Sequence, residues 1–131
     1  MNPSSVDIAE FLEGEIENLR RGDNLFVSYQ PDEPSNCVII FDTSARPLHI
    51  TMDRKYYEYP SVQVQIRYIN FIDAWAIAEE IKEKLLSWGG QTVNDVFYSL
   101  IHPSAPFHLG RDEKHRELIV INCEIQRRKG G

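Results

Sequence analysis

The sequence predicts an α+β protein in which two main helices pack on a mixed or antiparallel sheet of about five to six strands. Two observations carry this prediction. Apolar residues recur at three- and four-residue intervals in two segments, as in amphipathic helices, and they alternate or run unbroken in several others, as in strands. The order is helix, two strands, an unsettled segment, a strand, a second helix and two or three further strands, which is typical of α+β folds.

The composition is that of a soluble globular protein, and the length fits a single domain over residues 1–131. Of the 131 residues, 42% are hydrophobic and 26% are charged, and the formal net charge is −6. An acidic chain lacks the positive surface that general binding to nucleic acids requires. No stretch resembles a secretion signal or approaches the roughly 18 apolar residues of a membrane span. We therefore expect no membrane partner.

The first helix is expected to run from the N-terminus to about Arg20. Ser4 and Ser5 can cap its start, and Gly22 is a natural stop. The apolar residues that recur at helical spacing between these limits are Ile8, Phe11, Leu12, Ile16 and Leu19.

Two strands follow, over 25–29 and 37–41, with a turn rich in proline and acidic residues between them. The second strand is an unbroken apolar run and should be covered on both faces. Cys37 in this run and Cys123 near the C-terminus are interpreted as buried thiols. A disulfide between them would require neighbouring strands.

Residues 43–60 carry no core pattern and are expected to form a flexible loop, with a weak strand over 48–53 as the alternative. Three tyrosines in four residues, Tyr56, Tyr57 and Tyr59, favour contact with a partner, because aromatic residues are enriched in interfaces. A loop folded back over its own core is the other interpretation.

The clearest strand covers 61–68, where apolar and polar residues alternate and therefore face opposite sides. The apolar residues are Val62, Val64, Ile66 and Tyr68, and the polar residues are Gln63, Gln65 and Arg67. Two amides and a guanidinium are specific hydrogen-bonding groups. This polar face is therefore predicted to be a structural or interaction surface.

Asp73 is expected to cap the second helix, whose apolar stripe continues to Trp88 before Gly89 and Gly90 end it. The remaining expected strands are 96–101, 107–110 and 116–127. The basic residues 128–131 should form a frayed tail.

The residue patterns favour a binding or assembly module over an enzyme, and no cofactor is expected. The chain has no His-x-x-x-His or Cys-x-x-Cys spacing, no Gly-rich phosphate loop and no Gly-x-Ser-x-Gly motif. The residues that could still form a site are His102, His108 and Cys123 for a metal ion, and Asp32, Glu33 and Asp42 for paired carboxylates.

Several motifs occur in a recognisable order. They are PDEP at 31–34, CVIIFDT at 37–43, PSVQVQIR at 60–67, GRDE at 110–113 and RELIVIN at 116–122. Together they resemble the tail terminator proteins of long-tailed bacteriophages, often labelled minor capsid proteins, over nearly the whole chain. The chain departs from that pattern at 44–46, where a glycine is expected, and at Cys123, where an aromatic residue is usual.

The resemblance implies a siphovirus tail protein that forms a homohexameric ring on the end of the tail tube. The ring would stop tube polymerisation and join the head, without catalytic residues or cofactors. Its expected partners are other copies of the chain, the tail tube protein and a head-completion or connector protein, while DNA slides through the lumen without specific binding. The expected place is the head–tail junction of the virion, after assembly in the cytoplasm of the bacterial host. The alternatives are another head–tail connector or tube ring component and, less favoured, a small enzyme.

The candidate contacts with neighbouring subunits or the tube come from the polar strand face, the tyrosine segment and the turn at 110–115. They are Gln63, Gln65, Arg67, Tyr56, Tyr57, Tyr59, Arg111 and Asp112. Arg67, Arg111 and Asp112 are expected to form polar pairs across these contacts. For Arg67, pairing within its own sheet is the alternative.

Overall fold

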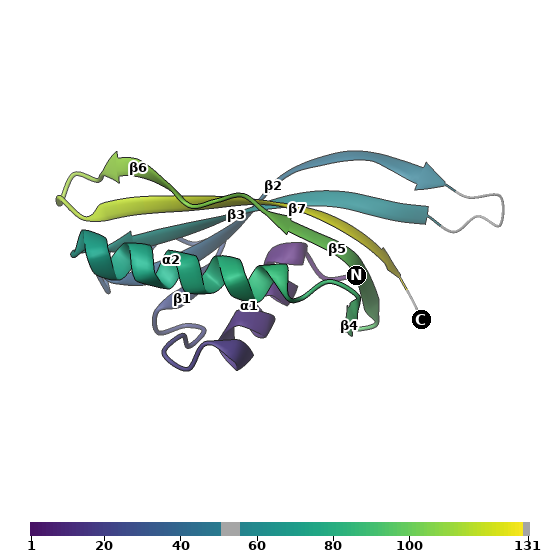
Figure 1. The fold of residues 1–131 in the computed structure, drawn as a ribbon, viewed down its shortest axis with the longest axis horizontal. Coiled ribbons are helices and arrows are strands. Elements are labelled where there is room, and N and C mark those ends of the chain that lie inside the picture. The colour runs from purple at the N-terminus through teal and green to yellow at the C-terminus, as the bar shows by residue number, and fades with distance from the viewer. Residues whose placement is uncertain (51–55, 130–131) are drawn as a thin grey trace.

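The computed structural model describes residues 1–50 and 56–129. Helices α1 (Ser4–Glu15) and α2 (Phe71–Leu86) lie on one face of a curled seven-stranded sheet (Figure 1). The strands are β1 (Leu25–Val27), β2 (Cys37–Ile50), β3 (Tyr56–Tyr68), β4 (Gln91–Val93), β5 (Val96–Pro103), β6 (Phe107–Arg111) and β7 (Glu117–Lys129). The predicted α+β class with two main helices is confirmed.

The sheet has the strand order β1-β2-β3-β7-β5-β4. β1 pairs with β2 in parallel, and all other pairs are antiparallel, so the sheet is mixed. β5 and β6 lie on the same side of β7, where β5 pairs with residues 123–129 and β6 pairs with residues 117–120. β7 is the last strand in the sequence, yet it lies in the interior of the sheet.

The hydrophobic core lies between the sheet and the two helices. β3 contributes Val62, Val64 and Ile66 to it, so the alternation predicted for 61–68 is confirmed. The members from the helices are Ile8, Ala9 and Leu12 of α1 and Ala74, Ala78, Ile81 and Leu85 of α2. Burial of each large aliphatic side chain contributes about 1.5–3 kcal/mol, so this layer accounts for most of the stabilisation of the fold.

The ends of α1 differ from the expectation. Ser4 and Ser5 lie inside the first turn, after Pro3, and neither side chain caps the helix. α1 ends at Glu15 because the backbone of Ile16 is extended, with φ −116° and ψ 110°. Ile16 and Leu19 are nevertheless buried in the core. Their spacing therefore predicted burial correctly, although not the helical conformation.

α2 begins three residues earlier than expected. Asn70 is its N-cap and accepts a hydrogen bond from the backbone N–H of Asp73 at 3.0 Å. The prediction of Asp73 as the cap was therefore wrong by one turn. Trp88 lies just beyond the end of the helix at Leu86, and it is fully buried between the rings of Phe11 and Tyr98, each 4.7 Å away.

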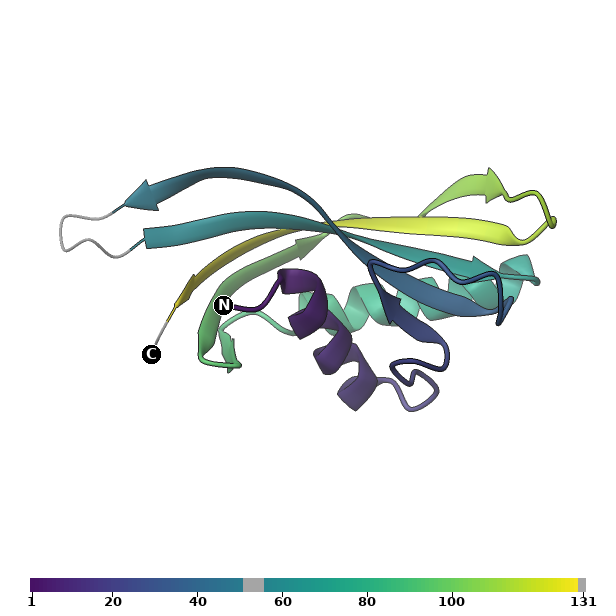
Figure 2. The same ribbon diagram turned by 180° about the vertical axis from the view of Figure 1, so that it is seen from behind.

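β2 and β3 extend as a paired arm beyond the helices (Figures 1 and 2). Residues 43–50 and 56–60 belong to these strands, whereas a flexible loop was expected over 43–60. The ladder continues to the pair Ile50 and Tyr56, with register shifts after Asp42 and Arg46. Backbone pairing forms this arm where no core pattern exists. The weak strand raised as the alternative over 48–53 is observed for residues 48–50. Residues 51–55 lie outside the described residues.

The C-terminal half contains one strand that the sequence did not indicate. β4 and β5 are joined by Asn94 and Asp95, whose φ values of 51° and 64° suit a tight two-residue hairpin turn. β7 continues to Lys129, so residues 128 and 129 are strand rather than a frayed tail, and residues 130–131 lie outside the described part. Cys37 and Cys123 are buried free thiols, as predicted. Burial raises the pKa of Cys123 to about 12.

Candidate functional site

The helix-free face of the sheet carries the polar residues that alternate with the core residues of β3. Gln63 lies opposite Asn122 of β7 and donates a hydrogen bond from Nε2 to its Oδ1 at 3.2 Å. Ser61 lies opposite Glu124, and Gln65 lies opposite Val120. This face of the sheet therefore presents mainly amide, hydroxyl and carboxylate groups at its centre.

Arg67, at the end of the same row, is a buried cation with an exposed fraction of only 1%. Its Nη2 donates to the carbonyl of Pro34 at 2.8 Å, and its Nε donates to the carbonyl of Ser35 at 3.3 Å. These bonds hold the segment between β1 and β2, residues 28–36, against β3. Arg67 is therefore bonded within its own subunit, but to this segment and not within its own sheet as the alternative supposed, and contact with a second copy stays a prediction.

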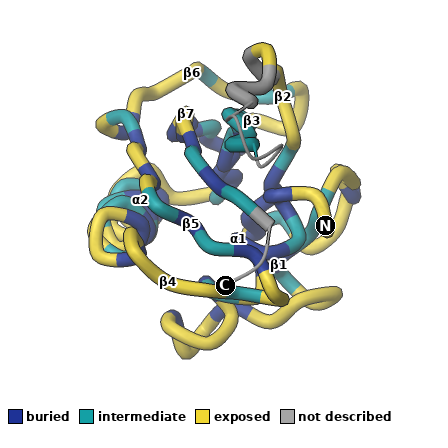
Figure 3. The backbone as a smooth tube through the Cα atoms, turned by 90° about the vertical axis from the view of Figure 1, so that its right-hand side faces the viewer, coloured by how far each residue is buried: buried dark blue, intermediate teal, exposed yellow. Residues whose placement is uncertain are grey.

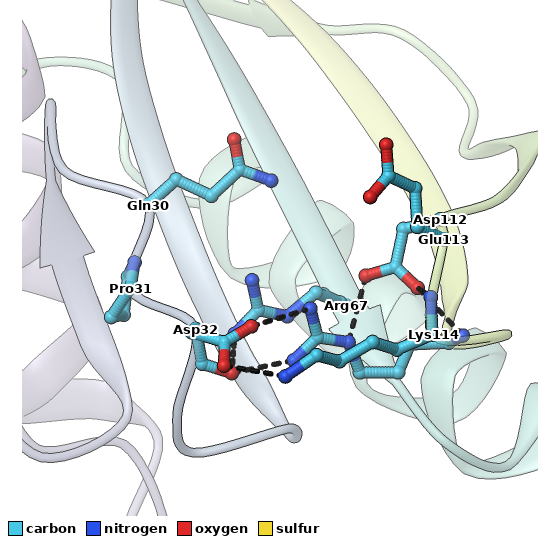
Figure 4. Close-up of a pocket in the computed structure, with 8 residues that line it drawn as sticks. Gln30, Pro31, Asp32, Arg67, Asp112, Glu113 and Lys114 are labelled. Carbon is cyan, nitrogen blue, oxygen red and sulfur yellow. Dashed lines mark hydrogen bonds and ion pairs between the residues drawn. The ribbon is translucent and has the colours of Figure 1, made fainter.

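A polar pocket of about 280 Å³ lies beside Arg67, between the 28–36 segment and the turn from β6 to β7 (Figure 4). Its lining residues are Gln30, Pro31, Asp32, Arg67, Asp112, Glu113, Lys114 and Arg116. The fold thus brings two of the candidate residues, Arg67 and Asp112, to one site from distant parts of the sequence.

Ion pairs close the walls of this pocket. Arg116 donates from Nε to Asp112 Oδ2 at 2.7 Å and from Nη1 to the carbonyl of Asp32 at 2.6 Å. Lys114 pairs with the carboxylate of Asp32, and this hydrogen bond lowers the pKa of Asp32 below its ordinary value. Partial burial alone would raise the pKa of Asp112, but the hydrogen bonds from Arg116 and Lys114 lower it. The arrangement holds the 28–36 segment and the turn from β6 to β7 together.

Arg111 lies outside the pocket, at the end of β6. Its side chain is 64% exposed, and its Nε donates to Glu117 Oε1 at 2.6 Å. The other oxygen of Glu117 lies 2.7 Å from His108 Nε2, and the His108 ring packs edge-on against Phe71 with centroids 5.0 Å apart. Arg111 therefore anchors the edge strand to β7 and still presents much of its side chain outward.

The tyrosine segment lies at the other end of β3 from the pocket (Figure 1). Tyr56, Tyr57 and Tyr59 are half-buried in the arm. By strand alternation, Tyr57 and Tyr59 share the face of Gln63, and Tyr56 lies on the face of the helices. The candidate contact residues thus form two groups at opposite ends of the molecule, joined by the polar row of β3.

Sequence reasoning missed a buried ionic cluster around Asp7, which is fully buried in α1. The hydroxyl of Tyr98 donates to Asp7 Oδ2, and Asn94 Nδ2 donates to Asp7 Oδ1 at 2.8 Å. Arg127 lies 3.9 Å from the same carboxylate and donates to Glu58 Oε1 at 2.9 Å. Arg127 was expected at the edge of a solvated basic tail. Its place in an otherwise apolar alternating strand was the one available signal of burial.

Within residues 1–50 and 56–129, no three His, Cys, Asp or Glu side chains are grouped to hold a metal ion. His102 is exposed on β5, and His108 is bonded to Glu117, so the alternative site with Cys123 is not assembled. In the same part of the chain, no helix has the length and apolar character needed to cross a membrane.

The fold is of the α+β class, and the candidate site consists of polar surfaces and loops held by ion pairs. A family model described as bacteriophage tail terminator protein matches residues 6–129, and the chain belongs to this family. The resemblance found in the sequence motifs is thereby confirmed. The family is one of phage structural proteins and not of enzymes, and membership makes the protein a virion component. No curated protein sequence matches the chain.

Proposed function

We propose that six copies of the chain form a closed ring that caps the tail tube, stops its polymerisation and presents its other face to a head-completion or connector protein. The observation that carries this proposal is the family match over residues 6–129. A head-to-tail interface produces either a closed ring or an open filament, depending on the rotation between copies. A terminator must close, because an open arrangement would lengthen the tube.

The helix-free face of the sheet is the proposed lining of the DNA channel. Its central described residues include Ser61, Gln63, Asn122 and Glu124, none of which is cationic. Arg128, on the same face near the end of β7, lies with its guanidinium over the ring of Phe97. The chain as a whole has a formal net charge of −6. Phosphate contacts with Lys and Arg supply most non-specific affinity for DNA, so a face of amides, hydroxyls and carboxylates would let DNA slide without holding it.

The two ends of the molecule supply the proposed contacts with neighbours and with the tube. At one end lies the arm with Tyr56, Tyr57 and Tyr59, and at the other lies the turn with Arg111 and Asp112. A head-to-tail contact joins two different patches of the same molecule, and patches at opposite ends fit that requirement.

Electron microscopy and light scattering of the purified protein, alone and with isolated tail tubes, test this proposal. Discrete six-membered rings, and rings seated at tube ends, are the expected result. Long tubes would instead indicate a tube component, and rings that bind heads but not tubes would indicate a connector. In infected cells, loss of the protein should give tails of excessive length, assembled in the host cytoplasm and unable to join heads.

A further inference from the structure

The outer edge of β6 is open. β6 pairs with β7 along one edge, and among residues 1–50 and 56–129 no strand pairs with the other. The strand is exposed along most of its length (Figure 3), with Phe107 41% and Leu109 59% exposed. An exposed edge strand offers a row of unpaired N–H and C=O groups to any extended segment of matching length.

The same sheet has a second open edge on its other side. β1 pairs with β2 only at Val38, Ile39 and Ile40, and the described residues provide no further strand along that edge. Pro47 lacks a backbone N–H and interrupts the row of donors. The open stretch before it is 42–46, which has the same length as the five residues of β6.

The strand directions make these two edges complementary. β2 is antiparallel to β3, β3 to β7, and β7 to β6, so β2 and β6 run in opposite directions on opposite edges of the sheet. If rotation about a ring axis brings the β6 edge of one copy beside the β2 edge of the next, the directions are kept and the pair is antiparallel. β6 and the arm lie at opposite ends of the molecule (Figures 1 and 2). Pairing β6 with the arm of the next copy therefore offsets neighbouring copies along the strand direction. A sheet that closes into a ring requires such an offset, because its strands tilt against the ring axis.

Charge supports the same pairing. Arg111 lies opposite Glu117 on the helix side of the sheet, and its side chain is 64% exposed. Asp42 lies opposite the core residue Val62, so it is also on the helix side, and it is exposed although it bonds to Ser5 of α1. An antiparallel register with Arg111 opposite Asp42 brings these opposite charges together on one face.

We propose that β6 of one copy pairs antiparallel with residues 42–46 of the next copy, so that the subunit sheets join into one continuous sheet around the ring. This inference rests on the proposed ring and adds the segments, the direction and the register of the contact. The occupant of the β6 edge is a second copy of this chain, because the chain itself carries an open strand of the same length, the opposite direction and the complementary charge.

Hydrogen exchange of the wild-type protein tests the pairing directly. Amides in both 42–46 and 107–111 should exchange at least tenfold more slowly in assembled rings than in dilute subunits. β4, the short edge strand at residues 91–93, is the control and should exchange at an unchanged rate. Rings in which 42–46 and 107–111 keep their subunit rates, or in which β4 is protected instead, would overturn the pairing and leave the ring itself intact.

A charge-exchange cycle tests the register. Arg111→Asp and Asp42→Arg should each lower the fraction of assembled protein several-fold at equal concentration, and the double variant should recover most of it. Glu80→Arg, a charge reversal at an exposed position of α2, should assemble as the wild type does. Circular dichroism identifies any variant that fails to fold, which matters for Asp42→Arg because Asp42 also bonds to Ser5. Folded single variants with no recovery in the double variant would reject the register. The absence of rings with every variant and the wild type, even on tail tubes, would reject the proposed function as well.

Discussion

At the scale of single residues, the buried charges decide how the subunit is held together. Arg67 and Asp7 are both almost completely buried, and each is surrounded by groups that compensate its charge or hydrogen-bonding capacity. A buried charge that loses its partners is strongly destabilising, whereas an exposed ion pair contributes little. The strongest effects of substitution are therefore expected at these two positions rather than at the many exposed acids.

Arg67→Ala should lower the free energy of unfolding by about 2–4 kcal/mol, because charge-assisted bonds to three carbonyl groups are lost inside the protein. Arg67→Lys should recover little of it, since an ammonium group cannot reproduce the planar set of donors. Urea denaturation measures the change, with the exposed Arg21→Ala as a control expected within about 0.5 kcal/mol of wild type. A loss below that limit for Arg67→Ala would contradict the anchoring role of the side chain.

Tyr98→Phe should cost about 1–3 kcal/mol, because it removes a donor from the buried carboxylate of Asp7. The exposed Tyr29→Phe is the matched control. Burial raises the pKa of Tyr98 above its ordinary value. Above about pH 10 the unfolded state loses the Tyr98 proton while the folded state retains it. The free energy of unfolding should therefore fall as the pH rises above this value. A Tyr98→Phe protein whose alkaline unfolding matches wild type would argue against this linkage.

At the scale of elements, the spacing of apolar residues predicted which side chains are buried in the core, but not where every element ends. The core face of β3 and the buried stripe of α2 were evident because apolar spacing records burial. The end of α1 and the arm were not, because they depend on the backbone conformation at Ile16 and on ladder pairing between residues 43–50 and 56–60. The pocket was also beyond reach, since Asp32, Arg67 and Arg116 meet only once the sheet is formed.

The turn from β6 to β7 should make stability sensitive to acid. The pKa values of Asp112 and Glu117 are both below their ordinary values. Burial alone would raise each pKa, but hydrogen bonds outweigh it. Arg116 supplies these bonds to Asp112, and Arg111 and His108 supply them to Glu117. The folded state thus binds fewer protons than the unfolded state. The resulting stabilisation is complete above the ordinary carboxyl pKa of about 4 and is lost as the pH falls through the lower folded values.

Urea midpoints measured from pH 7 down to pH 3 test this expectation. The wild type should lose more stability over this range than Asp112→Asn, which lacks one of the responding carboxyl groups. Equal losses in both proteins would show that Asp112 does not contribute to the acid response.

At the scale of the whole molecule, the core and the proposed assembly contacts lie in different parts of the chain. The core is confined to the region between the sheet and the helices, and the arm extends beyond it (Figure 2). The sequence motifs indicated the family, which the match over residues 6–129 confirms. They did not indicate the open strand edges used in the proposed pairing, because these appear only once the sheet is complete.

Shortening the arm should separate folding of the subunit from its proposed assembly on the tail. Replacing residues 48–56 with an Asn-Gly turn should leave a folded subunit with a melting temperature within a few degrees of wild type, since the described core lies between the sheet and the helices. The same variant should fail to cap tail tubes and should give tails of irregular length. Normal tail lengths with the shortened arm would show that the arm has no part in termination.

The interior position of β7 also constrains how the chain acquires its structure during synthesis. Residues 117–129 pair with β3 on one side and with β5 and β6 on the other, so a nascent chain that lacks them holds two incomplete half-sheets. Proteins are translated from the N-terminus, and exposed strand edges in incomplete chains favour aggregation. The sheet therefore becomes complete only once this strand has been translated, and until then β3, β5 and β6 lack the strand they all pair with.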